Sequence, residues 1–331
     1  MSKLTVVTGA SGHIGANLVR TLLKSGRRVR VVVHDSPIGL DGLDVERVRG
    51  DVRDRASLVS AFRGADVVFH LAAIISIQGD KDGHVAAVNV GGARNAAEAA
   101  LEAGVRRMVH TSSIHAFDQY CPRSGPLTEA SARTLAPDRP AYDRSKAAGE
   151  VAVREVIAKG LDAVIVHPAG VIGPFDYRPS RMGQVLLDLY HRRLPALVPG
   201  GYNFVDVRDV VDGMLAAETR GRRNESYILA NEWASVRDIA RLAHESTGVK
   251  PPRLVTPFWV AHLGVPFMTV FANVTKTHPV YTAESLGALQ ADSKADLTKA
   301  RTELGYAPRP LFDTIRDSYE WFRGAGMLRP A

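Results

Sequence analysis

Thr8-Gly9-Ala10-Ser11-Gly12-His13-Ile14-Gly15 joins a strand-like run, Leu4 to Thr8, to a helical stretch, His13 to Lys24. A second β-branched run, Val29 to Val33, follows the helix, so the segment is typical of a βαβ unit. Glycines allow a tight turn and a close approach of the backbone to a ligand, and free amides at the helix start would hold a pyrophosphate. A purely structural turn is the alternative. The cofactor contacts predicted at this turn are Gly9, Ser11, Gly12, His13, Ile14 and Gly15.

Short apolar runs continue to alternate with helical stretches through the first half of the chain. Strands alternating with helices predict an α/β fold, a doubly wound parallel sheet covered on both faces. The further strands are expected at Val45 to Arg49, Val67 to His70, Met108 to Thr111 and Ala163 to Val166, and the helices at Ala56 to Arg63, Ala86 to Ala103 and Tyr142 to Lys159.

The pattern changes after His167-Pro168, where proline and glycine recur in loops that carry short elements. We therefore divide the chain into a dinucleotide-binding domain, residues 1–167, and a smaller C-terminal substrate-binding lobe, residues 168–331. Two more helical stretches are expected between Asp296 and Phe322. Chains of this plan often interleave, so we expect the second part to cross back to the sheet.

The charge of the chain does not indicate a nucleic-acid partner. Its 331 residues include 42 Lys+Arg, of which 33 are arginine, against 35 Asp+Glu, a formal charge of +7. The arginines are scattered in pairs such as Arg106-Arg107, and no run of five or six like charges occurs. We expect most of them to be surface charges.

The cysteine content and the apolar segments of the chain indicate in which cellular compartment the protein is expected. Cys121 is the only cysteine, which fits a reducing compartment, and no export signal precedes the first strand, so we expect a cytoplasmic protein. The longest apolar stretch, Phe258 to Val274, is too short and too interrupted to span a bilayer and is expected to form a buried or interfacial helix pair.

The end of the second strand reads Val33-His34-Asp35, where a dinucleotide-binding unit normally discriminates the ribose. An acidic side chain there pairs with a 2′-hydroxyl and a basic one with a 2′-phosphate. Valine removes the usual carboxylate, and His34 can donate a hydrogen bond or carry charge, which favours NADP(H) slightly. Asp35 could still turn inward and leaves NAD(H) open, and both residues could simply cap the strand.

Tyr142 and Lys146 stand at i and i+4 on one helix face. An adjacent ammonium, together with an oxidised nicotinamide ring, could lower the tyrosine pKa towards the range of a general acid. Ser113 ends the strand that begins at Met108, at the sheet edge where open α/β folds bind ligands, and could polarise a carbonyl beside Tyr142.

Together these features resemble the extended short-chain dehydrogenase/reductase family, over nearly the whole chain and with a Rossmann-type sheet. The resemblance implies that Ser113, Tyr142 and Lys146 are catalytic, with Ser112 shaping the site. It also implies that Asn89 supports the active-site backbone. The cofactor contacts it implies are Asp51 and Val52 at the adenine, Leu71, Ala72 and Ala73 along the cofactor, Thr111 and Ser112 at the strand end, and Pro168, Ala169, Gly170 and Val171 around the nicotinamide.

Within that family the chain looks most like the dihydroflavonol-reductase-like branch. Tyr202-Asn203-Phe204 stands where sugar-nucleotide epimerases of the family carry an arginine-bearing segment, which weakens a sugar-nucleotide function. In the dihydroflavonol-reductase-like branch an arginine often takes the place of His34. The histidine of this chain departs from that pattern and leaves the choice between NADP(H) and NAD(H) open.

Several other side chains are candidate substrate or metal contacts. His115 could reach a substrate, although a solvated loop histidine is the simpler interpretation, and Phe175, Tyr177 and Tyr202 could line a pocket for a carbonyl compound of some hydrophobic bulk. Cys121 lacks an evident base and is interpreted as a small loop residue, and the histidine spacing predicts no metal site.

The resulting hypothesis is an NAD(P)-dependent oxidoreductase that moves hydride between nicotinamide and a ketone or secondary alcohol, with no nucleic-acid or membrane-spanning partner. An epimerase that uses the same hydride step twice is the alternative, and a non-catalytic cofactor-binding protein is a third. A homodimer is expected through the helices at Ala86 to Ala103 and Tyr142 to Lys159.

Overall fold

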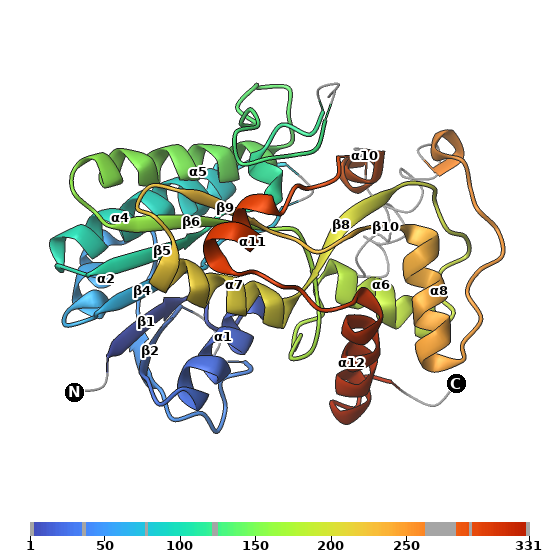
Figure 1. Cartoon of the computed structure of the whole chain (residues 1–331), viewed down its shortest axis with the longest axis horizontal. Coiled ribbons are helices and arrows are strands. Elements are labelled where there is room, and N and C mark those ends of the chain that lie inside the picture. The colour runs from blue at the N-terminus through green and yellow to red at the C-terminus, as the bar shows by residue number, and fades with distance from the viewer. Residues whose placement is uncertain are drawn as a thin grey trace.

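The computed structural model of the chain describes residues 3–34, 38–76, 79–120, 125–261, 283–290 and 293–328 (Figure 1). Asp35, Cys121 and most of the apolar stretch from Phe258 to Val274 lie outside the described residues, so the predictions made for them stay untested.

A seven-stranded parallel sheet forms the larger part of the molecule, which confirms the predicted fold class. The strand order β3-β2-β1-β4-β5-β6-β9 reverses direction between β1 and β4, and ligands of open α/β sheets bind outside the carboxyl ends of the strands at such a point. The strands are β1 (Leu4–Thr8), β2 (Arg28–Val33), β3 (Glu46–Arg49), β4 (Val67–His70), β5 (Arg107–Thr111), β6 (Ala163–Pro168) and β9 (Ser226–Leu229).

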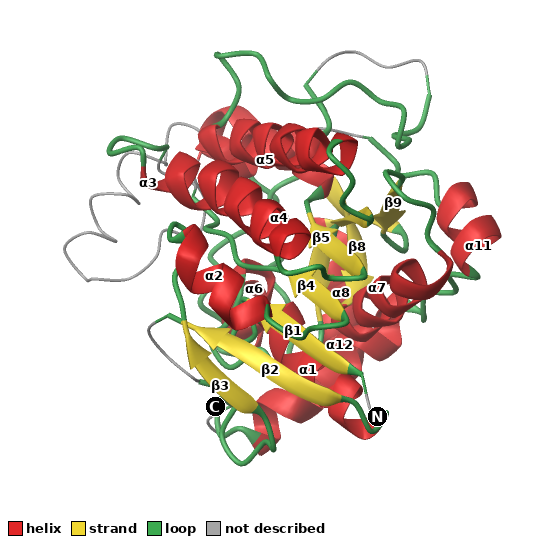
Figure 2. Cartoon of the chain, turned by 90° about the vertical axis from the view of Figure 1, so that its left-hand side faces the viewer, coloured by secondary structure: helices red, strands yellow, loops and turns green. Residues whose placement is uncertain are grey.

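Helices cover both faces of this sheet. On one face α2 (Arg55–Phe62), α4 (Gly92–Glu102) and α5 (Ala141–Ala158) lie side by side (Figure 2) and share a core with Val6, Val68 and Met108. On the other, α1 (His13–Lys24) packs against α7 (Val207–Arg220). The burial of apolar side chains on both sides explains why the strands read as nearly continuous apolar runs.

The helix expected at Ala86 to Ala103 is interrupted. It consists of α3 (His84–Ala86), a π-helical turn at Ala87–Gly91 and then α4. Single π-helical turns inside α-helices frequently mark functional sites, and this one carries Asn89, whose contacts are described below.

A second, three-stranded sheet lies beyond the carboxyl edge of the first (Figure 1). In it β8 (Gly201–Asp206) pairs in parallel with β7 (Gly170–Ile172) and antiparallel with β10 (Trp233–Ser235). Between β8 and β10 the chain returns to the large sheet as β9. The remaining described helices are α6 (Arg181–Tyr190), α8 (Val236–Thr247), α10 (Ala283–Gln290), α11 (Thr298–Leu304) and α12 (Leu311–Gly324).

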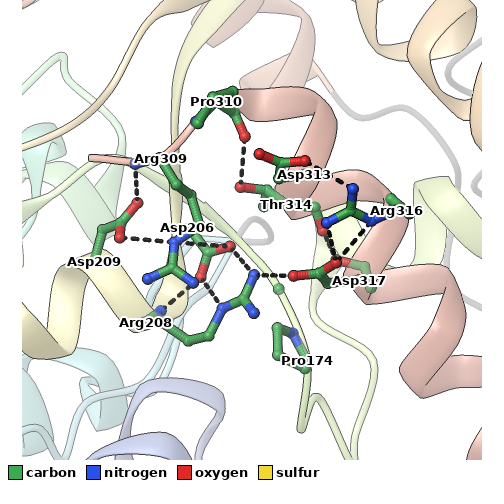
Figure 3. A network of polar contacts seen from close by, with 12 residues as sticks. Pro174, Asp206, Arg208, Asp209, Arg309, Pro310, Asp313, Thr314, Arg316 and Asp317 are labelled. Carbon is green, nitrogen blue, oxygen red and sulfur yellow. Dashed lines mark hydrogen bonds and ion pairs between the residues drawn. The ribbon is translucent and has the colours of Figure 1, made fainter.

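An ion-pair network fixes the C-terminal segment to the start of α7 (Figure 3). Asp206 is buried, accepts a hydrogen bond from the Arg208 amide as the cap of α7, and pairs with the Arg208 guanidinium at 2.7 Å. The same guanidinium reaches Asp317 on α12 at 2.7 Å, and Arg309 pairs with Asp209 at 2.8 Å. Buried carboxylates need such partners, so α12 and α7 are held together by more than apolar contact.

None of the described helices combines the length and apolar character that a bilayer span requires. The described part of the chain also gathers no group of three or more histidine, cysteine, aspartate or glutamate side chains suited to hold a metal ion.

Candidate active site

The glycine-rich turn lies between β1 and α1 at the carboxyl edge of the sheet. Gly9 has φ +70°, and a Cβ there would stand 2.7 Å from the Ala72 nitrogen, so only glycine fits this turn. A Cβ on Gly15 would collide with the Gly9 carbonyl oxygen, which shows how closely α1 packs on the turn. Gly12 precedes α1 and no side chain caps the helix, so its first amides have no acceptor within the helix or from a capping side chain. This is the cradle that a pyrophosphate requires.

His13 contributes to the turn differently from the other predicted contacts. Its Nε2 lies 3.1 Å from the Gly173 carbonyl oxygen and 3.0 Å from that of Pro174, and Asn17 donates a hydrogen bond to the same Pro174 oxygen. The His13 side chain therefore connects the turn to the loop after β7, and a contact between His13 and the cofactor stays a prediction.

The loop after β4 is held beside the turn by two side chains. The amides of Leu71 and Ala72 each lie 3.3 Å from the Thr8 hydroxyl oxygen. Asn89 accepts a hydrogen bond from the Ile74 amide and donates to the Ile74 carbonyl and to Ser145 Oγ. Asn89 thus couples this loop to α5 one residue before Lys146, as the family resemblance implies for a backbone-supporting residue.

Ser113, Tyr142 and Lys146 converge at the end of β5. The Ser113 hydroxyl lies close enough to the Tyr142 phenol to affect its pKa, and it accepts a 3.2 Å hydrogen bond from the His115 amide. The Lys146 ammonium, one helical turn after Tyr142, donates a 2.8 Å hydrogen bond to the Thr111 carbonyl. Beside that carbonyl, Thr111 Oγ1 and Ser112 Oγ are buried without a hydrogen-bond partner among the described residues. Together with the cradle at α1, these unpartnered polar atoms fit a bound nicotinamide dinucleotide.

Burial shifts the pKa values of both Tyr142 and Lys146. Burial raises the pKa of the Tyr142 phenol to about 12, the Asp143 charge adds to the rise, and the nearby Ser113 hydroxyl opposes it. Burial also lowers the pKa of the Lys146 ammonium to about 8, against the attraction of Glu150. The lowering of the tyrosine pKa that we expected is not a property of the protein alone, because desolvation outweighs the neighbouring charges. At neutral pH the phenol is protonated.

His115 is not the solvated loop residue considered above. Its Nδ1 lies 3.1 Å from an Asp143 carboxylate oxygen and its Nε2 lies 2.9 Å from the Tyr202 hydroxyl. The imidazole meets the Tyr142 ring edge-on, with centroids 5.6 Å apart, and stacks on the Tyr202 ring at 5.7 Å. The structure therefore brings His115 and Tyr202, two of the predicted substrate contacts, to Tyr142.

Phe175 and Tyr177 lie elsewhere. The Arg20 guanidinium of α1 stacks over both rings, Tyr177 receives a 2.7 Å hydrogen bond from Arg20, and both rings pack on Trp321 of α12. Their observed contacts thus join α1 to α12, and a role towards a substrate stays a prediction.

The predicted nicotinamide segment joins the two sheets. Pro168 ends β6 and Gly170 begins β7, where a Cβ would stand 3.0 Å from the Tyr202 ring and 3.1 Å from the Asn203 carbonyl oxygen. Gly170 therefore allows β7 to pack closely against β8. The segment Pro168 to Val171 stays a predicted cofactor contact.

At the other end of the predicted cofactor site, His34 and Asp51 meet at the ends of β2 and β3. His34 Nε2 lies 3.2 Å from an Asp51 carboxylate oxygen, and the Arg53 guanidinium donates hydrogen bonds to both oxygens of the same carboxylate. Arg53 is not among the residues predicted from the sequence. Its position two residues after a predicted adenine contact was the available signal.

A second polar cluster missed by sequence reasoning centres on Glu150. Its carboxylate receives hydrogen bonds from Arg133 and Arg154 and lies 2.9 Å from His167 Nε2. Burial alone would raise the pKa of this carboxyl, but His167 and Arg133 outweigh burial and hold the pKa well below its usual value. The i+4 spacing from Lys146 places Glu150 on the same helix face, but the partners that neutralise it come from distant segments.

A model of the NAD dependent epimerase/dehydratase family matches residues 5–230. The chain belongs to this family. Sterol demethylase protein B of Methylococcus capsulatus is 38% identical over 98% of this chain and 99% of its own length. A putative dihydroflavonol 4-reductase of Synechocystis is 34% identical over 99% and 97%. The crystal structure of gox2253 superposes with a TM-score of 0.83 at 33% identity and covers 99% of this chain and 100% of that one. The family resemblance inferred from the motifs is confirmed, and with it an NAD(P) cofactor.

Proposed function

We propose that this member of the family is a reductase or dehydrogenase that interconverts a ketone and a secondary alcohol. The observation that carries the proposal is the convergence of Ser113, Tyr142 and buried Lys146, whose ammonium is fixed on the Thr111 carbonyl, at the carboxyl edge that also holds the glycine-rich turn. The names of several relatives, among them a ketoreductase and a ceramide reductase, support this class of reaction.

Each residue of the trio has a separate task. A nicotinamide cofactor held at the glycine-rich turn would supply the hydride for reduction or accept it in the reverse direction. Ser113 and Tyr142 donate hydrogen bonds to the carbonyl oxygen and orient it, and Tyr142 Oη transfers its proton to that oxygen as the alcohol forms. Lys146 is fixed on the Thr111 carbonyl, and its positive charge stabilises the phenolate that remains.

The protonation state favours the reductive direction. Burial keeps the Tyr142 pKa at about 12, so the acid is present in its proton-bearing form at neutral pH. Oxidation would need the phenolate, which the protein alone disfavours.

The aromatic side chains beside Tyr142 support a ketone of hydrophobic bulk. Tyr202 stacks on His115, and the Phe204 ring meets Tyr202 edge-on with centroids 6.1 Å apart. Such a wall suits a flat or fused-ring compound, with His115 and Tyr202 as its polar contacts. Two of the relatives are named for a sterol and for a dihydroflavonol, compounds of this kind.

The test is a panel of ketones, aldehydes and alcohols assayed by nicotinamide absorbance with NADPH and NADH. Replacing Tyr142→Phe should lower kcat about 1,000-fold while NADPH binding, followed by fluorescence, is retained. Tyr190→Phe, a half-buried tyrosine on α6, is the matched control. Near-native turnover by the Tyr142 variant would refute the mechanism. Cofactor that stays bound through purification, with no net absorbance change, would indicate the epimerase alternative instead.

We further infer a homodimer through α4 and α5. The two helices lie side by side (Figure 2), Arg94 and Glu155 connect them at 2.7 Å, and Val151 on α5 is 41% exposed. Val151→Glu should convert the protein to a monomer in light scattering, whereas Leu135→Glu, exposed outside these helices, should not. A monomeric wild-type protein would contradict the inference.

A further inference from the structure

A row of hydrogen-bonded side chains lies beside the catalytic trio and has no task in hydride transfer. His115 Nδ1 lies 3.1 Å from Asp143 Oδ1, and His115 Nε2 lies 2.9 Å from the Tyr202 hydroxyl. Tyr120 donates a 2.7 Å hydrogen bond to the other oxygen of the buried Asp143 carboxylate. We call this set the His115 row; it runs from Tyr120 through Asp143 and His115 to Tyr202.

The Asp143 carboxylate fixes the direction of these hydrogen bonds. An ionised carboxylate only accepts, so the imidazole of His115 must present its proton to Asp143 on Nδ1. A neutral imidazole carries one proton, and Nε2 is then an acceptor. The Tyr202 hydroxyl has a single proton to donate, and Nε2 takes it. Towards its other surroundings the Tyr202 oxygen is therefore an acceptor.

Tyr202 keeps this proton at neutral pH. Burial raises the pKa of the Tyr202 phenol well above its usual value, the Asp143 charge adds to the rise, and the nearby Gln119 side chain opposes it. The phenol therefore stays intact, with its only proton committed to His115.

Tyr202 lies next to the place where hydride transfer is expected. A Cβ on Gly170 would stand 3.0 Å from the Tyr202 ring, and Gly170 belongs to the segment predicted to contact the nicotinamide. The Tyr202 ring stacks on His115, and His115 meets the Tyr142 ring edge-on. When Tyr142 holds the carbonyl oxygen of a ketone, a group on the neighbouring carbon can reach the Tyr202 hydroxyl.

We propose that Tyr202 accepts a hydrogen bond from a donor group on the carbon next to the reacting carbonyl, and that Asp143 determines this preference through His115. The proposal rests on the proposed function and narrows its substrate to a ketone with a neighbouring hydroxyl or amino group. Asp143 and Tyr120 are positioning residues, because they set the direction of the bonds without touching the substrate. An ether oxygen in the same place would meet the lone pairs of Tyr202 and bind less well.

The kinetic test compares two ketones at about pH 7.5, above the range in which histidine side chains ordinarily ionise. α-Hydroxyacetophenone can donate to Tyr202, whereas α-methoxyacetophenone can only accept. The wild type should reduce the hydroxy ketone with a kcat/KM about tenfold higher.

Asp143→Asn should change this preference by reversing the bonds. Tyr120 still donates to the side-chain oxygen, so the amide nitrogen turns towards His115 and donates to Nδ1. The imidazole then carries its proton on Nε2, and Tyr202 becomes the donor. We expect kcat/KM to rise for the methoxy ketone and to fall for the hydroxy ketone, until the two are about equal.

Two further variants separate this effect from a loss of structure. Tyr202→Phe should lower kcat/KM for the hydroxy ketone without a gain for the methoxy ketone. Asp138→Asn, in an exposed pair with Arg139, should keep the wild-type ratio. A merely structural role of Asp143 would lower kcat/KM for both ketones by one factor, and this result would overturn the proposal.

The position of the imidazole proton gives a readout that needs no turnover. Nuclear magnetic resonance of protein with isotope-labelled histidine distinguishes the two neutral tautomers, and His115→Gln identifies the signals. The proton should lie on Nδ1 in the wild type and on Nε2 in Asp143→Asn. The same tautomer in both proteins, or equal kcat/KM of the wild type for the two ketones, would overturn the proposal alone. Failure of the wild type to reduce any ketone would overturn the proposed function, and the substrate preference with it.

Discussion

Lys146 and Glu150 lie one turn apart on α5 and are both buried, with exposures of 5% and 1%, yet their surroundings differ. The Lys146 ammonium has a neutral carbonyl as its hydrogen-bond acceptor. The Glu150 carboxylate has two guanidinium groups and an imidazole. Both pKa values are lowered, but the shift disfavours the charged form of the lysine and favours that of the glutamate.

The difference supports the catalytic role proposed for Lys146 and indicates a structural role for Glu150. Opposite charges around a buried ion offset the free-energy cost of its desolvation and hold it in its charged form. A buried ion with one neutral acceptor is destabilised, so the protein carries it at a cost, and such perturbed groups concentrate at functional sites. On this view the first turns of α5 serve chemistry and the next turn serves stability.

The largest expected effect is on activity. Lys146→Met should reduce kcat/KM about 1,000-fold, because the phenolate of Tyr142 loses its neighbouring charge. The free energy of unfolding at neutral pH should be unchanged or higher, since no ammonium is buried. Urea unfolding and steady-state kinetics test both, with Lys159→Met at the end of α5 as control. A large loss of stability in the Lys146 variant would contradict the distinction between a catalytic Lys146 and a structural Glu150.

The complementary change should act on folding. Glu150→Gln leaves Arg133, Arg154 and His167 without their carboxylate and should lower the free energy of unfolding by about 3 kcal/mol. Turnover per folded molecule should stay near the wild-type value. Glu155→Gln, in an exposed pair with Arg94, should cost less than about 1 kcal/mol. If Glu150→Gln instead abolished turnover in a stable protein, Glu150 would have a role in catalysis, like Lys146.

The pH dependence gives a smaller but sharper comparison. Above pH 8 the folded protein loses the Lys146 proton that the unfolded chain keeps up to about pH 10.5, so the stability due to this group rises with pH. Between pH 7 and 9.5 the wild type should gain about 2 kcal/mol relative to Lys146→Met. Over the same range kcat/KM of the wild type should fall, because the ammonium is lost. Parallel trends in the two measurements would contradict the assignment.

The sequence predicted the parts of this molecule that local pattern controls. The runs at Leu4 to Thr8 and Val67 to His70 and the helix His13 to Lys24 agree with the observed bounds. The trio Ser113, Tyr142 and Lys146 could be expected to meet because parallel strands bring their carboxyl ends to one edge. The glycine-rich turn could likewise be predicted from its local sequence, because the glycines stand between a strand and a helix.

The remainder depended on contacts between distant segments. Arg133 and His167 reach Glu150 from a loop and from β6, and nothing in their own neighbourhoods indicates that they would. Likewise Asp143 and Tyr202 contact His115 from different elements. The π-helical turn that carries Asn89 accompanies its hydrogen bonds with Ile74 and Ser145, and the hydrophobic periodicity of the sequence does not reveal such bonds.

The return of β9 to the large sheet restricts how this chain can be divided. β9 pairs with Ile165 to Pro168 of β6, so a fragment that stopped at residue 167 would leave the backbone groups of a central strand uncovered. Exposed strand edges of this kind recruit other chains. Grafting the substrate lobe of a relative by a single crossover near residue 168 would therefore also exchange the outermost strand of the cofactor sheet. Chimeras need two crossovers, on either side of β9, to change substrate without changing the sheet.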